Sequence, residues 1–167
     1  MLRAGKLVDA SHPAWQLAAR VAARRLPALV RQGRVSHSRR YQARLSVADV
    51  FPKLPARVCR CGCGQVLPKG RRAWASDECL HAAVSVLLVL KGDSREVRRL
   101  LWLRADGRCE WCGRGLTWRT RFGVPWEADH IAPVERGGAA CLLEGYQALC
   151  VDCHATKTAI DRRLGLC

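Results

Sequence analysis

Residues 109–112 have the sequence Cys-Glu-Trp-Cys, and residues 150–154 have the sequence Cys-Val-Asp-Cys-His. The two cysteine pairs are separated by 37 residues. Four thiolates fill the tetrahedral shell of a zinc ion and leave no open coordination position. The pattern therefore predicts one structural zinc, and its binding free energy would serve as folding free energy for a module with a small core. The predicted ligands are Cys109, Cys112, Cys150 and Cys153.

The chain has 167 residues and ten cysteines, and disulfides would be the other use for so many thiols. The N-terminal residues lack the continuous apolar run of a secretory signal, and the apolar run 82–90 is too short to span a bilayer. We therefore expect zinc rather than disulfides, no membrane partner, and an intracellular location in the cytoplasm or nucleoid. A basic, acid-poor N-terminus is also typical of organelle transit peptides, so organelle targeting stays open.

The net charge of +15 is unevenly distributed along the chain. Residues 1–58 contain 12 lysines and arginines against two acidic residues, and residues 59–108 contain ten against five. Residues 109–167 contain seven of each sign. A cationic excess of this size favours a polyanionic partner, because each neutralised phosphate releases counterions. We expect DNA, with a merely solvated basic tail as the alternative.

Three segments are expected from these shifts in composition. Residues 1–58 are predicted to be a basic, partly helical arm, with Ser11 capping a helix that Pro27 would kink or end. Residues 59–92 would contain a degenerate zinc knuckle and an apolar segment, helix or strand. Residues 93–167 would form the domain that carries the chemistry, beginning with a helix that runs to about residue 105.

A second cysteine cluster lies upstream, and it could hold a second zinc. Three of its cysteines fall within five residues, which is unusual for a zinc knuckle. His81 is close enough in sequence to complete the shell, whereas a degraded finger with free thiols is the alternative. The candidate ligands are Cys59, Cys61, Cys63 and Cys79.

The region between the downstream cysteine pairs contains an Asp-His step at 129–130, a Pro-Val step at 133–134 and Gly137-Gly138, and the final Cys-x-x-Cys-His follows. These elements occur in the order found in the HNH endonuclease family, which the chain resembles over roughly residues 105–160. It is similar in particular to the branch that includes an annealing-helicase-type nuclease domain. The resemblance implies an α+β fold, a small zinc-stapled ββα-metal finger, with the basic arm as a helical N-terminal extension.

By this resemblance, the chain would be a metal-dependent DNA endonuclease that leaves 5′-phosphate and 3′-hydroxyl ends. His130 would be the general base, since a neutral imidazole accepts a proton from water near neutral pH. Asp129 and His154 would hold one catalytic cation, Mg²⁺ or Mn²⁺, with Ni²⁺ or Zn²⁺ as competitors. Five cationic residues are candidates for backbone contact with DNA: Arg119, Arg121, Lys157, Arg162 and Arg163.

The sequence departs from the family's pattern at two positions. Gly145 stands where the family has an asparagine that fixes the hairpin, and Ala75 stands where the upstream knuckle would have a cysteine. Glu144 or Gln147 could take over the role of the asparagine. The alternative reading is a zinc-containing, nucleic-acid-binding adaptor that keeps the HNH scaffold without catalysis.

Overall fold

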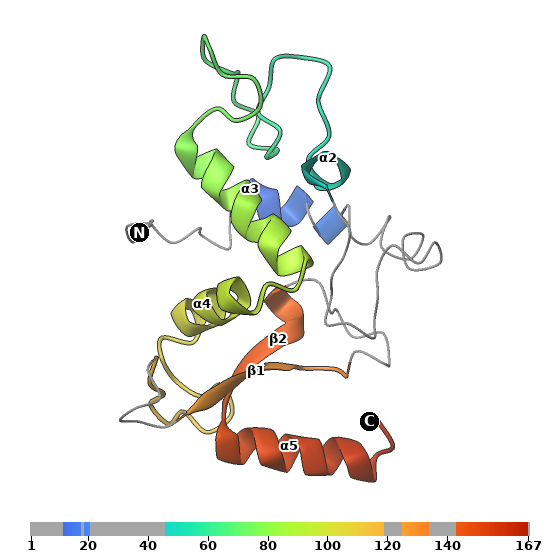
Figure 1. Ribbon diagram of the computed structural model, residues 1–167, viewed down its shortest axis with the longest axis vertical. Helices are drawn as coiled ribbons and strands as arrows, with labels where there is room; N and C mark the ends of the chain where they lie inside the picture. Colours follow the sequence, from blue (N-terminus) through green and yellow to red (C-terminus); the bar gives the residue numbers. More distant parts are fainter. Residues whose placement is uncertain (1–11, 18, 21–45, 119–124, 134–142, 167) are drawn as a thin grey trace. The chain divides into compact units, whose positions relative to one another are not determined.

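The computed structural model describes residues 12–17, 19–20, 46–118, 125–133 and 143–166. The chain divides into two compact units, residues 1–91 and residues 92–167 (Figure 1). The predictions that concern Ser11, Pro27 and residues 134–142 lie outside the described residues. Within the described parts, the helices are too short or too polar to traverse a bilayer.

Unit 1 contains the short helix α2, Val47–Val50, and the longer helix α3, Asp77–Leu90. The Ser46 side chain accepts a hydrogen bond from the Asp49 N–H, and the Asp49 carboxylate accepts one from the Ser46 N–H, which forms a capping box at α2. Phe51 follows α2 and packs edge-on against Trp74, with ring centroids 5.5 Å apart.

Helix α3 resolves the choice between helix and strand that the apolar run left open. Ser76 caps it by accepting a hydrogen bond from the Cys79 N–H. The buried side chains of Ala82, Val86 and Val89 recur at helical spacing, so one stripe of the helix faces the core of unit 1. Gly92 follows Leu90 and Lys91 with a φ of 71°, a left-handed conformation that favours glycine.

Unit 2 is built on a two-stranded antiparallel sheet of β1, Trp126–His130, and β2, Tyr146–Cys150. Helix α4, Ser94–Arg104, precedes the sheet and is capped by Asp93. The 3₁₀ turn η3, Leu143–Gly145, leads into β2, and helix α5, Val151–Arg163, follows it directly.

Helices α4 and α5 pack on opposite sides of the strand pair (Figure 1). Trp126 is almost fully buried and lies against Trp102 and Trp118, with ring centroids 6.0 and 6.4 Å away. The mixture of helices, a small antiparallel sheet and two cysteine clusters confirms the predicted α+β class. The sheet is too small to bury a core by itself, which is why the cysteine clusters matter for folding.

Candidate metal centres and active site

The downstream cysteines come together as predicted. The sulfurs of Cys109, Cys112, Cys150 and Cys153 all lie within 4.8 Å of one another. The Cys112 and Cys150 sulfurs are 3.8 Å apart, and tetrahedral zinc–thiolate geometry requires about 3.8 Å. Burial raises the pKa of Cys109, but hydrogen bonds from the backbone N–H groups of Cys112 and Cys150 outweigh it and lower the pKa to about 6. The donor set therefore fits a zinc ion, and we call it the downstream cage.

The upstream cysteines form a second group of the same kind, which we call the upstream cage. The sulfurs of Cys59, Cys61, Cys63 and Cys79 also lie within 4.8 Å of one another, so this group too could hold zinc. His81 is exposed and is not part of the group.

Ala75, which stands where the resemblance implies a cysteine, contributes its backbone to the upstream cage instead. Its N–H donates to the Cys59 sulfur over 3.2 Å, and the Ser76 hydroxyl donates to the Cys79 sulfur over 3.3 Å. Such donors stabilise thiolate charge without acting as ligands. Four cysteines therefore suffice for this cage, although the expected position carries alanine.

Asp129 lies at the centre of a polar cluster formed by β1, β2 and α5. Its Oδ1 is 3.5 Å from Nε2 of His154, and its Oδ2 is 3.3 Å from Nζ of Lys157. The Asp129 side chain is 14% exposed and that of His154 is 38% exposed, so the His154 side opens toward solvent. Oxygen and nitrogen ligands of one octahedral cation lie about 3 Å apart, so this pair fits a shared divalent ion.

Lys157 is buried beside this pair, although the sequence suggested a surface contact with DNA. Its ammonium lies 2.6 Å from Oδ2 of Asp161 on the same helix and bridges to Asp129. Burial lowers the pKa of Lys157, but these two carboxylates outweigh it and raise the pKa. The ammonium therefore stays charged and leaves a net charge of −1 on the Asp129–Lys157–Asp161 cluster. Contact between Lys157 and DNA stays a prediction.

Gln147 holds the Asp129 carboxylate from the neighbouring strand. The two residues are paired in the β1–β2 register, and Nε2 of Gln147 donates to Oδ2 of Asp129 over 2.9 Å. The other end of the amide accepts a hydrogen bond from the Trp111 indole over 3.0 Å. Since Trp111 lies within the downstream cage loop, the cage, the amide and the carboxylate form one continuous network.

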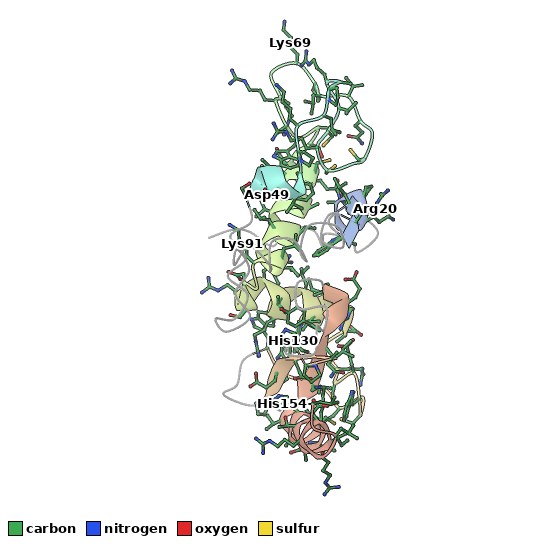
Figure 2. All side chains as sticks on the ribbon, turned by 90° about the vertical axis from the view of Figure 1, so that its right-hand side faces the viewer. Arg20, Asp49, Lys69, Lys91, His130 and His154 are labelled. Atoms are coloured by element: carbon green, nitrogen blue, oxygen red, sulfur yellow. The ribbon has the colours of Figure 1, made fainter. Side chains whose placement is uncertain are left out.

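His130 is the last residue of β1 and is paired with Tyr146 of β2. The two rings lie against each other with centroids 4.3 Å apart. Burial lowers the pKa of His130, the Asp129 carboxylate opposes this, and the positive charge of Lys157 adds to it. The imidazole is thus held in its neutral form near pH 7, and it shares the electrostatic environment of the Asp129 cluster. Figure 2 marks His130 on β1 and His154 on α5.

Gly145, at the asparagine position of the resemblance, is buried at the end of η3. Its carbonyl accepts a hydrogen bond from the Ile131 N–H over 2.9 Å, directly after His130. Backbone atoms therefore tie the end of β1 to η3 in a place where a side chain was expected.

Arg104 and Glu110 attach the remaining elements of unit 2 to the strand pair. Arg104 donates to the carbonyls of Leu143 and Tyr146 over 3.0 and 2.7 Å and pairs with Glu110. Glu110 in turn accepts from the Ala148 N–H over 2.6 Å. Neither residue has a sequence signal for this role beyond its proximity to the first cysteine pair.

Of the four other candidate residues for contact with DNA, two lie within the described part of the chain and two lie outside it. Arg162 and Arg163 are exposed in the last turn of α5, where a basic side chain is also favourable for the helix dipole. Arg119 and Arg121 lie outside the described residues. The two cysteines that belong to neither cage, Cys141 and Cys167, lie outside them as well.

Comparison with known proteins gives a family for this region. Residues 109–159 match the family model described as HNH endonuclease. The DNA annealing helicase and endonuclease ZRANB3 of Mus musculus, Bos taurus and Homo sapiens is in each case 50% identical over 34 residues, which is 20% of this chain. The matched part spans only 3% of those relatives' length. The comparison with solved structures found no match to the chain.

Proposed function

We propose that residues 109–159, which match the HNH endonuclease model, form a domain that hydrolyses phosphodiester bonds in DNA with one divalent cation. The observation that carries the proposal is the 3.5 Å approach of the Asp129 carboxylate to the His154 imidazole, on a half-open side of unit 2. An oxygen and a nitrogen donor leave several positions for water and phosphate, and Mg²⁺ or Mn²⁺ suits them, with Ni²⁺ or Zn²⁺ as competitors.

The protein's own groups would work on either side of the scissile phosphate. Asp129 and His154 would bind the cation, while Gln147 and Lys157 hold the Asp129 carboxylate so that Oδ1 stays available. When bound, the cation stabilises the negative charge that develops on the phosphate and on the leaving 3′ oxygen.

His130 would take a proton from water, and the oxygen of that water would attack phosphorus as the bond to the 3′ oxygen breaks. The products are a 5′-phosphate and, after the 3′ oxygen is protonated, a 3′-hydroxyl. The lowered pKa of His130 supports this role because a base must be unprotonated at the working pH.

The decisive experiment measures nicking of supercoiled plasmid by the zinc-loaded chain with Mg²⁺, Mn²⁺, Ni²⁺ or Zn²⁺ added in turn. We expect His130→Ala to abolish nicking and Asp129→Asn to reduce it at least about a hundredfold, because each removes a group acting on the transition state. His81→Ala is the matched control, since His81 is an exposed histidine outside the upstream cage. Equal rates for His130→Ala and wild type, or no cleavage by wild type with any of the four cations, would refute the proposal.

A second candidate is the non-catalytic adaptor, which the glycine at position 145 favours. It predicts salt-sensitive binding to DNA without cleavage, and no change in affinity in Asp129→Ala. A binding assay run beside the plasmid assay distinguishes the two candidates, because only the endonuclease couples bound cation to strand breakage.

A further inference from the structure

Unit 1 contains a cationic pocket beside the upstream cage. Its volume is about 550 Å³, and its walls are supplied by residues 53–58 together with Arg60, Leu67, Arg71 and Arg72. Among the described residues that line it, five are lysine or arginine and none is acidic. The five cationic residues are Lys53, Arg57, Arg60, Arg71 and Arg72.

The loops of the upstream cage hold these cations in place through backbone hydrogen bonds. Leu67 N–H donates to the Arg57 carbonyl over 2.8 Å, and Arg60 N–H donates to the Ala73 carbonyl over 3.0 Å. Cys59, a cage ligand, lies between Arg57 and Arg60 in the chain. The pocket is therefore part of the folded cage and not a chance grouping of mobile side chains.

Most of this positive charge is not neutralised within the described part of unit 1. Arg71 pairs with Asp77 over 2.9 Å. The Arg57 guanidinium has only a long, 3.5 Å contact with the Pro68 carbonyl. The buried Nε of Arg60 has no hydrogen-bond partner among the described residues. Charge-assisted hydrogen bonds from guanidinium groups to an anion are strong, so these arginines favour an anionic occupant of the pocket.

We infer that this pocket binds the phosphodiester backbone of DNA, as a second nucleic-acid site separate from the cleavage centre. Planar guanidinium groups match phosphate oxygens, and four arginines around one pocket suit successive phosphates better than one small anion. Leu54 and Leu67 also line the pocket and offer apolar surface for deoxyribose. The inference goes beyond the proposed cleavage, because it gives unit 1 a role in holding DNA that requires no chemistry.

The test measures binding of the full chain to a labelled 20-base-pair duplex by fluorescence anisotropy across a range of salt concentrations. The cleavage-impaired His130→Ala background keeps the duplex intact. We expect Arg57→Ala with Arg72→Ala to raise Kd at least about fivefold and to reduce the slope of log K against log salt by about 1.8, since each lost phosphate contact removes about 0.9.

A matched control removes the same charge elsewhere in unit 1. Arg20 and Lys69 do not line the pocket, and both are labelled in Figure 2. Arg20→Ala with Lys69→Ala should change Kd less than twofold. Equal losses for the two pairs would overturn the inference, because they would show that net charge alone sets the affinity. Arg57→Lys with Arg72→Lys, which keeps the charge, checks that a loss is not caused by misfolding, as does zinc content.

Two further arms separate this inference from its alternatives. Inorganic phosphate at about 10 mM is roughly tenfold above the Kd of a weak, millimolar site. At this concentration it should displace the duplex no better than chloride at equal ionic strength. Stronger displacement that the Arg57→Ala, Arg72→Ala pair abolishes would overturn the inference in favour of a free-phosphate site. Plasmid nicking by wild type is scored separately, so a failure of the proposed function leaves the binding result intact, and the reverse holds too.

Discussion

The upstream and downstream cages have the same four-sulfur composition but differ in how they enclose the chain. In the upstream cage, three ligands lie within residues 59–63, and Cys79 follows after 15 residues. In the downstream cage, 37 residues separate the two pairs, and that stretch contains β1 and most of β2. Closing a longer loop costs more conformational entropy, so the downstream metal would determine more of the tertiary structure.

The two cages also lie in opposite electrostatic surroundings. A pocket lined by four arginines and one lysine lies beside the upstream cage. The downstream cage instead supports the Asp129 carboxylate through hydrogen bonds of Trp111 and Gln147. Under the two proposals, the same ligand chemistry would serve two purposes, which are holding cations toward a polyanion and holding a carboxylate toward a cation. Zinc specifies neither purpose, because a closed four-thiolate shell has no reactivity of its own.

The strongest test of this contrast removes one ligand from each cage. Cys150→Ser should unfold unit 2 and abolish cleavage, because structural zinc contributes about 10 kcal/mol or more to folding in small domains. Cys61→Ser should weaken duplex binding but leave hydrogen-exchange protection of β2 and α5 unchanged. Metal analysis should find one zinc fewer in each variant. Loss of protection in unit 2 of Cys61→Ser would show that the two units do not fold independently.

Lys157 offers the next largest effect, since it is the buried cation of an otherwise acidic cluster. Lys157→Met should destabilise unit 2 by roughly 3 kcal/mol, because it leaves two carboxylates without their shared partner. Adding Asp161→Asn should recover much of that stability without restoring cleavage, since Asp129 would still lack its ammonium contact. Urea unfolding and plasmid nicking give the two readouts. If the double variant cleaves at the wild-type rate, Lys157 serves stability only.

Gln147 should have a smaller effect, confined to chemistry. Gln147→Leu keeps a similar side-chain volume in β2 but removes the amide that holds Asp129, so we expect nicking to slow roughly 10- to 100-fold. Trp111→Phe removes only the outer link of the network and should cost less. If the carboxylate is misplaced in Gln147→Leu, the cation should bind more weakly, and a metal titration should show a higher cation concentration at the half-maximal nicking rate. An unchanged rate would mean that the strand register alone orients Asp129.

The ion pair between Arg114 and Asp152 should matter least. It joins the two cysteine pairs over 2.6 Å, but both side chains are more than half exposed. Water and salt compete well for such groups, so Arg114→Ala should leave the unfolding midpoint and zinc content unchanged within error. A clear shift in the midpoint would instead identify this pair as part of the downstream cage.

The local structure around each cage was largely predictable from the sequence. The helix predicted to run from about residue 93 to about residue 105 is α4, which Asp93 caps, and the two Cys-x-x-Cys pairs predicted the four sulfurs of the downstream cage. These signals work because capping and metal ligation depend on residues close together in the chain. The family resemblance located the candidate site at the Asp-His step, and the nicking assay tests the roles of these two residues.

Long-range contacts account for what the sequence left undetermined. Three contacts depend on segments that meet only after folding. They are the ion pair of the buried Lys157 with Asp129, the hydrogen bond from the Gln147 amide to Asp129, and the hydrogen bond from the Ala75 N–H to the Cys59 sulfur. A surface-like lysine pattern on a helix does not reveal a carboxylate that another strand delivers. The cysteine spacing and the family's short motifs, which lie along the sequence itself, predicted the class of domain, whereas tertiary packing decided which polar groups meet and where uncompensated charge remains.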